Sequence, residues 1–103
     1  MNDPAIICIA DRELDIARSD WFLKQLQPAF HLANVIIDLS KVEYMDSTCL
    51  GKLVVLRNTR VALGLSAPKV IVAHPQLRRI FGVVAFGHML PLFEDVESAK
   101  QTA

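Results

Sequence analysis

The 103-residue sequence has few of the features that assign a protein to a specialised class. It has only two cysteines, Cys8 and Cys49, which are too few for a disulfide framework and do not form a Cys-x-x-Cys pair. The three histidines are scattered, so no zinc template is met. Eleven Lys plus Arg balance eleven Asp plus Glu, with no run of like charges. We therefore expect reduced thiols, no metal and no direct binding to nucleic acid.

Long hydrophobic runs are also missing. The longest, such as residues 5–10, are too short to cross a bilayer, and the N-terminus lacks the basic and apolar segments of a secretory signal. Residues 1–103 are therefore expected to form a single cytoplasmic domain without membrane insertion.

Glycine is scarce, with four residues in the chain. Neither a phosphate-binding Gly-Lys-Ser/Thr loop nor a Gly-x-Gly-x-x-Gly dinucleotide motif is present. Ser47 has Met45 and Cys49 where a hydrolase nucleophile elbow needs glycines. These absences exclude the three motifs named, and no cofactor is expected.

What the sequence does contain is an alternation of β-prone and helical segments. Strands are predicted at 5–10, 35–39, 69–73 and 89–93, with helices at 19–30, 47–63, from 75 onward and after 94. This order predicts an α/β fold with a small mixed, mostly parallel sheet of four to five strands, flanked by about four helices. The run at 5–10 reads as a buried strand.

Local signals mark the ends of the first and third helices. Ser19 and Asp20 offer capping oxygens to the first helix, and Pro28 should disturb its last turn. His74 followed by Pro75 is typical of a cap before a proline at the first helical position.

The helix predicted over 47–63 has an apolar stripe and a cationic face. The stripe consists of Leu50, Leu53, Val54 and Val61. The opposite face carries Lys52, Arg57 and Arg60, which we expect in solvent. Gly64 is placed to end the helix in a left-handed conformation.

The junction before this helix carries the most informative residues. Asp46, Ser47 and Thr48 are all residues that cap helices, and a structural cap is the simplest interpretation. The run from Val35 to Gly51, however, is similar to the signature of the STAS domain. In that family an apolar-apolar-Asp-Leu strand leads through Met-Asp-Ser-Ser/Thr-Gly-Leu-Gly into a helix.

The resemblance extends to both ends of the chain. Residues 13–17 resemble the family's Gly-Glu-Leu-Asp-Ile-Ala turn, with Arg12 in place of the glycine. Residues 75–81 resemble its Pro-x-Val-x-Arg-Leu-Phe helix, although the Gly-Leu expected soon after is displaced to Gly87 and His88.

STAS domains occur in anti-sigma factor antagonists and in sulfate transporters. The resemblance implies an antagonist that binds an anti-sigma factor serine kinase, is released when the kinase phosphorylates Ser47, and is reset by a phosphatase. It also implies that the protein is a substrate and ligand in this cycle and not an enzyme. Thr48 is the second candidate for phosphorylation. The implied partner-binding residues are Asp15, Asp46, Ser47, Thr48, Cys49, Leu50 and Lys52.

Two residues depart from the family pattern. Cys49 stands where glycine is usual; it either acts as a small apolar replacement or narrows the surface offered to a kinase. No resolving cysteine is adjacent in sequence, which weighs against a redox role. Lys52 places a cation where the family tends to be apolar, facing either a partner or solvent.

Two other functions stay open at this point. The first is a STAS subunit of a bacterial ABC transporter of the lipid type, which docks on an ATPase without a phosphate cycle. The second is a small-molecule or nucleotide sensor that binds its ligand at the same helix N-terminus. Tyr44, Phe86 and Met89 are candidates either for a partner surface or for ordinary packing. The oligomeric state is undetermined.

Overall fold

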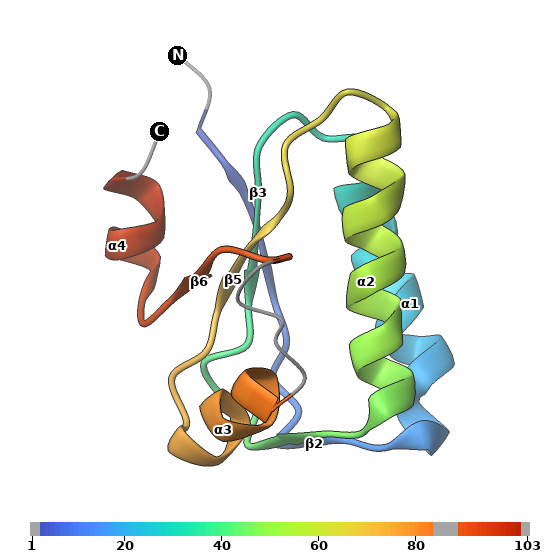
Figure 1. Ribbon diagram of the computed structural model, residues 1–103, viewed down its shortest axis with the longest axis vertical. Coiled ribbons are helices and arrows are strands. Elements are labelled where there is room, and N and C mark those ends of the chain that lie inside the picture. The colour runs from blue at the N-terminus through green and yellow to red at the C-terminus, as the bar shows by residue number, and fades with distance from the viewer. Residues whose placement is uncertain (1–2, 84–88, 102–103) are drawn as a thin grey trace.

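The computed structural model describes residues 3–83 and 89–101 (Figure 1). The strands are β1 (Ala5–Cys8), β2 (Glu13–Leu14), β3 (Val35–Asp38), β4 (Tyr44–Met45), β5 (Lys69–Ile71) and β6 (Leu92–Phe93). The α-helices are α1 (Ser19–Leu26), α2 (Ser47–Ala62), α3 (Pro75–Val83) and α4 (Val96–Gln101), with 3-10 helices η1 (Ile16–Arg18) and η2 (Gln27–Phe30).

The main sheet has the strand order β1-β3-β5-β6, and its described pairings are all parallel. Helices α1 and α2 lie on one face and α4 lies on the other (Figure 1). This confirms the predicted α/β class, with four sheet strands and four α-helices in the described residues. Strands β2 and β4 were not predicted; they form a separate parallel pair and have only two residues each.

The sheet buries side chains on both faces. On the α1 and α2 side, Ile37 and Val70 pack with Phe22 and Leu53 in the main core. On the other side, a smaller cluster of Ile36, Ile71 and Ala99 lies beneath α4, with Phe93 and Val96 packed against it. Burial on both faces explains why the central strand β3 is a continuous apolar run.

Strand β1 is not the buried strand that its composition predicts. It is an edge strand paired with β3, and Ile6 is 41% exposed while Cys8 is also exposed. Helix α4 packs mainly against β3, β5 and β6, so it leaves this part of the sheet face open.

The predicted helix ends are partly confirmed. The cap expected from Ser19 or Asp20 is wrong: Arg18 is the N-cap of α1 without a side-chain bond, and the Ser19 hydroxyl donates to the Ile16 carbonyl at 2.9 Å. Pro28 does change the end of the helix, because it lies in η2. His74 caps α3, with Nδ1 accepting from the Gln76 amide at 3.2 Å.

The C-terminal end of α2 differs most from the prediction, because it contains a buried arginine. Gly64 has a φ of +80°, as predicted, but Arg60 is fully buried rather than solvated. Its guanidinium donates to four backbone carbonyl oxygens, those of Ala29 (2.6 Å), Leu32 (2.6 Å), Ala33 (3.0 Å) and Ser66 (2.8 Å). Burial lowers the pKa of Arg60, and this side chain ties the end of α2 to the chain that follows α1.

Other predictions on this helix and beyond have mixed outcomes. Leu50 and Leu53 are buried as expected, whereas Val61 is 45% exposed. The strand predicted at 89–93 is limited to β6, and Met89 packs against the main core. Phe86, Gly87 and His88 lie outside the described residues. Within the described part of the chain, no helix is long and apolar enough to cross a membrane.

Candidate functional site

The candidate site forms where two distant segments meet at the start of α2. Strand β2 leads into Asp15 and η1, while β4 leads into Asp46 and α2. The two strands pair in parallel, and the Asp46 amide donates to the Leu14 carbonyl at 3.0 Å. This pairing brings Asp15 next to the junction at Asp46.

Asp46 is the N-cap of α2. Its backbone is extended, with φ −86° and ψ 174°, and its Oδ1 accepts from the Cys49 amide at 3.1 Å. The Leu50 amide donates to the Asp46 carbonyl at 3.0 Å, which begins the helical bonding. The predicted cap is therefore confirmed, and it leaves Ser47 as the first residue of the helix.

Ser47 and its neighbours differ in accessibility. Ser47 is exposed, while Asp46, Thr48 and Lys52 are half-buried. Asp15 is exposed and caps η1, its Oδ1 accepting from the Ala17 amide at 3.1 Å. Of the two predicted phosphorylation candidates, Ser47 is thus the more accessible to another protein.

Cys49 lies beneath this surface and connects its two halves. Its side chain has no exposed surface, and Sγ donates to the Asp15 carbonyl at 3.4 Å. Burial raises the pKa of the Cys49 thiol to about 11, with further contributions from the charge and hydrogen bonding of Asp46 and the charge of Asp15. The thiol is therefore protonated at neutral pH, which favours the apolar-replacement interpretation over a reactive one.

Leu50 is also buried, with 4% of its surface exposed. The side chains of Cys49 and Leu50, both predicted to be partner-binding residues, are therefore not part of the accessible surface. Two exposed apolar side chains lie on the same segments instead: Ile16, 67% exposed, follows Asp15, and Tyr44, 38% exposed, precedes Met45 and Asp46. Composition does not separate the exposed Ile16 from the buried Leu14, because both are aliphatic residues in one short turn.

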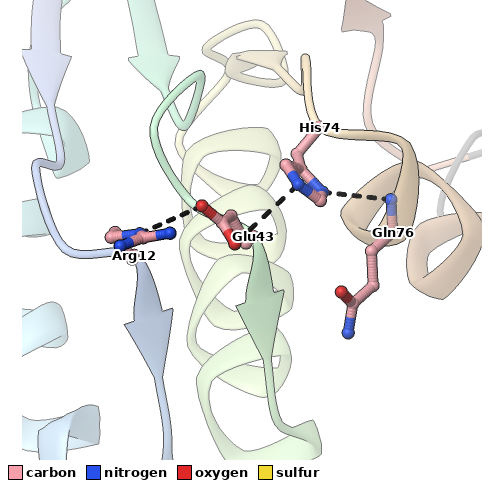
Figure 2. Close-up of polar contacts among 4 residues, drawn as sticks. All are labelled: Arg12, Glu43, His74 and Gln76. Carbon is pink, nitrogen blue, oxygen red and sulfur yellow. Dashed lines mark hydrogen bonds and ion pairs between the residues drawn. The ribbon is translucent and has the colours of Figure 1, made fainter.

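A polar cluster lies at the opposite end of the β2–β4 pair from Asp15 and Asp46 (Figure 2). Arg12 Nε donates to Glu43 Oε2 at 3.0 Å, and His74 Nε2 lies 3.8 Å from Glu43 Oε1. The Glu43 amide also donates to the Arg12 carbonyl at 2.7 Å. The cluster joins the segment before β2, the segment before β4 and the start of α3, so it positions the strand that delivers Asp46 and Ser47.

In the ranges 3–83 and 89–101, no three His, Cys, Asp or Glu side chains are grouped so that they could hold a metal ion. The arrangement offers an exposed hydroxyl at a capped helix start, two carboxylates beside it and two exposed apolar side chains. Such a surface is suited to contact with a macromolecule and to modification of the hydroxyl.

Comparisons with known proteins agree with this fold. The family model of the STAS domain matches residues 2–99. A crystal structure of TM1081, a putative anti-sigma factor antagonist from Thermotoga maritima, has a TM-score of 0.74 at 17% identity, covering 93% of this chain and 85% of that one. The anti-sigma factor antagonist SpoIIAA, solved in its unphosphorylated form, has a TM-score of 0.61 at 18% identity, covering 96% and 88% of the two chains. No curated protein sequence matches the chain.

Proposed function

This chain belongs to the STAS domain family, and from that membership we propose that it is an anti-sigma factor antagonist that acts by partner switching in the cytoplasm. In the unmodified state it binds an anti-sigma factor serine kinase, and phosphorylation of Ser47 releases it. The observation that carries the proposal is the position of Ser47, which is exposed at the first residue of α2 and flanked by the capping carboxylate of Asp46.

The proposed partner surface consists of Asp15, Asp46, Ser47, Thr48 and Lys52, together with the apolar side chains Ile16 and Tyr44. Exposed apolar residues rimmed by charged groups are typical of protein interfaces. Ile16 and Tyr44 supply apolar area, while the carboxylates and Lys52 supply directional contacts. The surface is neither strongly basic nor acidic, in line with a chain of zero formal net charge, which supports a protein partner over nucleic acid.

A phosphate on Ser47 affects binding more than folding. At the start of a helix, the unpaired amides and the positive end of the helix dipole favour an anion, so about two added negative charges are tolerated there. The same charges stand beside Asp46 and on the proposed interface, where they repel acidic groups and add bulk. One modification therefore lowers partner affinity while leaving the domain folded.

The protein acts as substrate and ligand in this cycle, and the chemistry belongs to its partners. The kinase transfers the phosphoryl group to the Ser47 hydroxyl, and a phosphatase returns the serine to its unmodified state. A transporter subunit would need no such cycle, and nothing in the comparisons favours that alternative.

The proposal is tested first by affinity capture from native cells. Mass spectrometry of the captured material should identify a serine kinase and a phosphate on the peptide that contains Ser47. A transporter ATPase and permease with unmodified Ser47 would contradict the proposal.

Affinity measurements with the captured kinase then test the role of Ser47 itself. Ser47→Asp should weaken binding at least about tenfold, a loss of about 1.4 kcal/mol of binding free energy, whereas Ser47→Ala should bind normally and resist phosphorylation. Ser66→Asp, which adds the same charge on the exposed segment beyond the other end of α2, is the matched control and should bind as the wild type does. Equal binding by Ser47→Asp and Ser47→Ala would refute the switch.

A further inference from the structure

The two edges of the main sheet are built differently. Strand β6 has only two residues, follows Pro91 and precedes Glu94 and Asp95, so its edge is short and flanked by residues that discourage strand pairing. Strand β1 also follows a proline, Pro4, and its apolar run ends at Asp11, but β1 is twice as long as β6 and none of the six residues from 5 to 10 is charged or a proline. Proteins normally protect such an apolar edge, because its unpaired backbone groups accept any extended chain.

The outer side of β1 is defined by its bonds to β3. The Ala5 amide donates to Asn34 and the Ile9 amide donates to Asp38, so the odd-numbered residues direct their backbone groups toward β3. The backbone groups of Ile6 and Cys8 therefore point away from the sheet. Both side chains lie on the face that α4 covers, and both are exposed, because α4 packs mainly against β3, β5 and β6.

We propose that the β1 edge is a homodimer interface in which two copies of this chain pair their β1 strands antiparallel about a two-fold axis at Ile7. In this register Ile6 of one copy lies opposite Cys8 of the other, and each such pair exchanges two backbone hydrogen bonds. The four strands of each copy then form one continuous sheet, and the exposed side chain of Ile6 becomes covered.

A second copy is the occupant that the sequence of β1 favours, and no charge opposes it. The strand carries no charge that would select an acidic or basic peptide, and the chain has a formal net charge of zero, so two copies do not repel each other. The strand is also self-complementary, because reversing it places an aliphatic side chain opposite a small apolar thiol on the same face. None of the residues of the proposed partner surface belongs to β1, so dimerisation and kinase binding are separable.

Sedimentation velocity of the reduced full chain over a range of concentrations tests the proposal. The wild type should show a concentration-dependent dimer, and Ile6→Lys should raise the dimer dissociation constant about tenfold or more, because it places a cation on the edge. Val55→Lys, on the half-exposed surface of α2, should dimerise as the wild type does. A wild type that remains monomeric up to about 1 mM, or an Ile6→Lys variant that dimerises normally, would overturn the proposal. Should Ile6→Lys fail to fold by circular dichroism, Cys8→Lys replaces it, with the same two outcomes.

Cross-linking tests the register separately. Opposite residues in a hydrogen-bonded antiparallel pair have Cα atoms about 5.5 Å apart, which a disulfide can span. Ile6→Cys should therefore oxidise to a covalent dimer through Cys8 of the other copy faster than Ile16→Cys, although Ile16 is the more exposed position. Equal or slower cross-linking of Ile6→Cys would overturn this register. Neither experiment involves Ser47 or the kinase, so its failure would leave the proposed function untouched.

Discussion

The two ends of helix α2 differ in how nearby backbone groups obtain hydrogen-bond partners. At the start, Asp46 satisfies the Cys49 amide three residues away, and the neighbouring Ser47 is exposed. At the other end, the buried cation of Arg60 satisfies carbonyl groups up to 31 residues away, where no solvent reaches the side chain. The first arrangement is local and can be altered without disturbing the core. The second is long-range, and the surrounding turns depend on it.

This difference has an energetic basis. Removing a guanidinium from water is costly, and here four hydrogen bonds from Arg60 to backbone carbonyl oxygens offset that cost. Three of those carbonyls lie at or just after the end of η2, where the partial negative charge of helical carbonyls also favours a cation. Arg60 thus works as a structural clamp, and the start of α2 is left available for function.

The largest effect is expected from removing the clamp. Arg60→Ala leaves four carbonyls without their donor and a cavity in place of the side chain, and it should lower the free energy of unfolding by about 3 to 5 kcal/mol. Denaturant unfolding measures the loss. Arg57→Ala, one turn earlier on the same helix and half-buried, should cost under about 1 kcal/mol. Equal losses in the two variants would show that the clamp has no special weight.

The next largest effect is a pH dependence of the free energy of unfolding that arises from Cys49. Folding raises the pKa of this thiol from 9.0 to about 11, so the unfolded chain releases the proton more readily. The contribution of the thiol to the free energy of unfolding is therefore fully present below pH 9 and is lost as the pH rises toward 11. The loss at the alkaline limit is about 2 to 3 kcal/mol. Unfolding measured from pH 8 to 11 should therefore decline more steeply for the wild type than for Cys49→Ala. Parallel curves would contradict the buried thiol.

The cap contributes less. Asp46→Ala removes the acceptor for the Cys49 amide and should cost about 1 kcal/mol of stability, whereas Asp46→Asn keeps an oxygen in the same place and should cost less. Thermal unfolding distinguishes the two variants. If both were as stable as the wild type, Asp46 would not be supporting the helix start.

The smallest effect on stability is expected at Ser47. Ser47→Asp adds an anion at the helix start without removing a buried contact, so the free energy of unfolding should change by under about 1 kcal/mol. Denaturant unfolding checks this value beside the binding measurement. A loss comparable to that of Arg60→Ala would mean that the start of α2 is as structurally constrained as its other end.

The same contrast explains what the sequence could reveal. A continuous apolar run located the central strand β3, helical periodicity located α2, and the capping residue types from Asp46 to Thr48 located its start, because each signal depends on neighbours within a few residues. The family resemblance placed Asp15 with Ser47 even though they are far apart in the chain. Strands β2 and β4 were not predicted, because a strand of two residues is too short to show an alternating hydrophobic pattern. Arg60 was misjudged because its bonding partners come from another segment, and a cation on a helix usually faces solvent.

Edge positions were a further source of error. The run at 5–10 looks like a central strand, yet β1 has a neighbour on one side and an incomplete cover of helix on one face. Whether such a strand is buried depends on its place in the sheet, and composition does not fix strand order. The apolar run therefore predicted a strand correctly and its burial incorrectly.

The central claim is that the start of α2 can accept a phosphate without loss of the fold. The most direct test is to prepare the chain with phosphoserine at position 47 and to measure both its free energy of unfolding and its affinity for the captured kinase. We expect stability within about 1 kcal/mol of the unmodified protein and affinity lower by at least about tenfold. Unchanged affinity, or unfolding of the phosphorylated chain, would contradict the account.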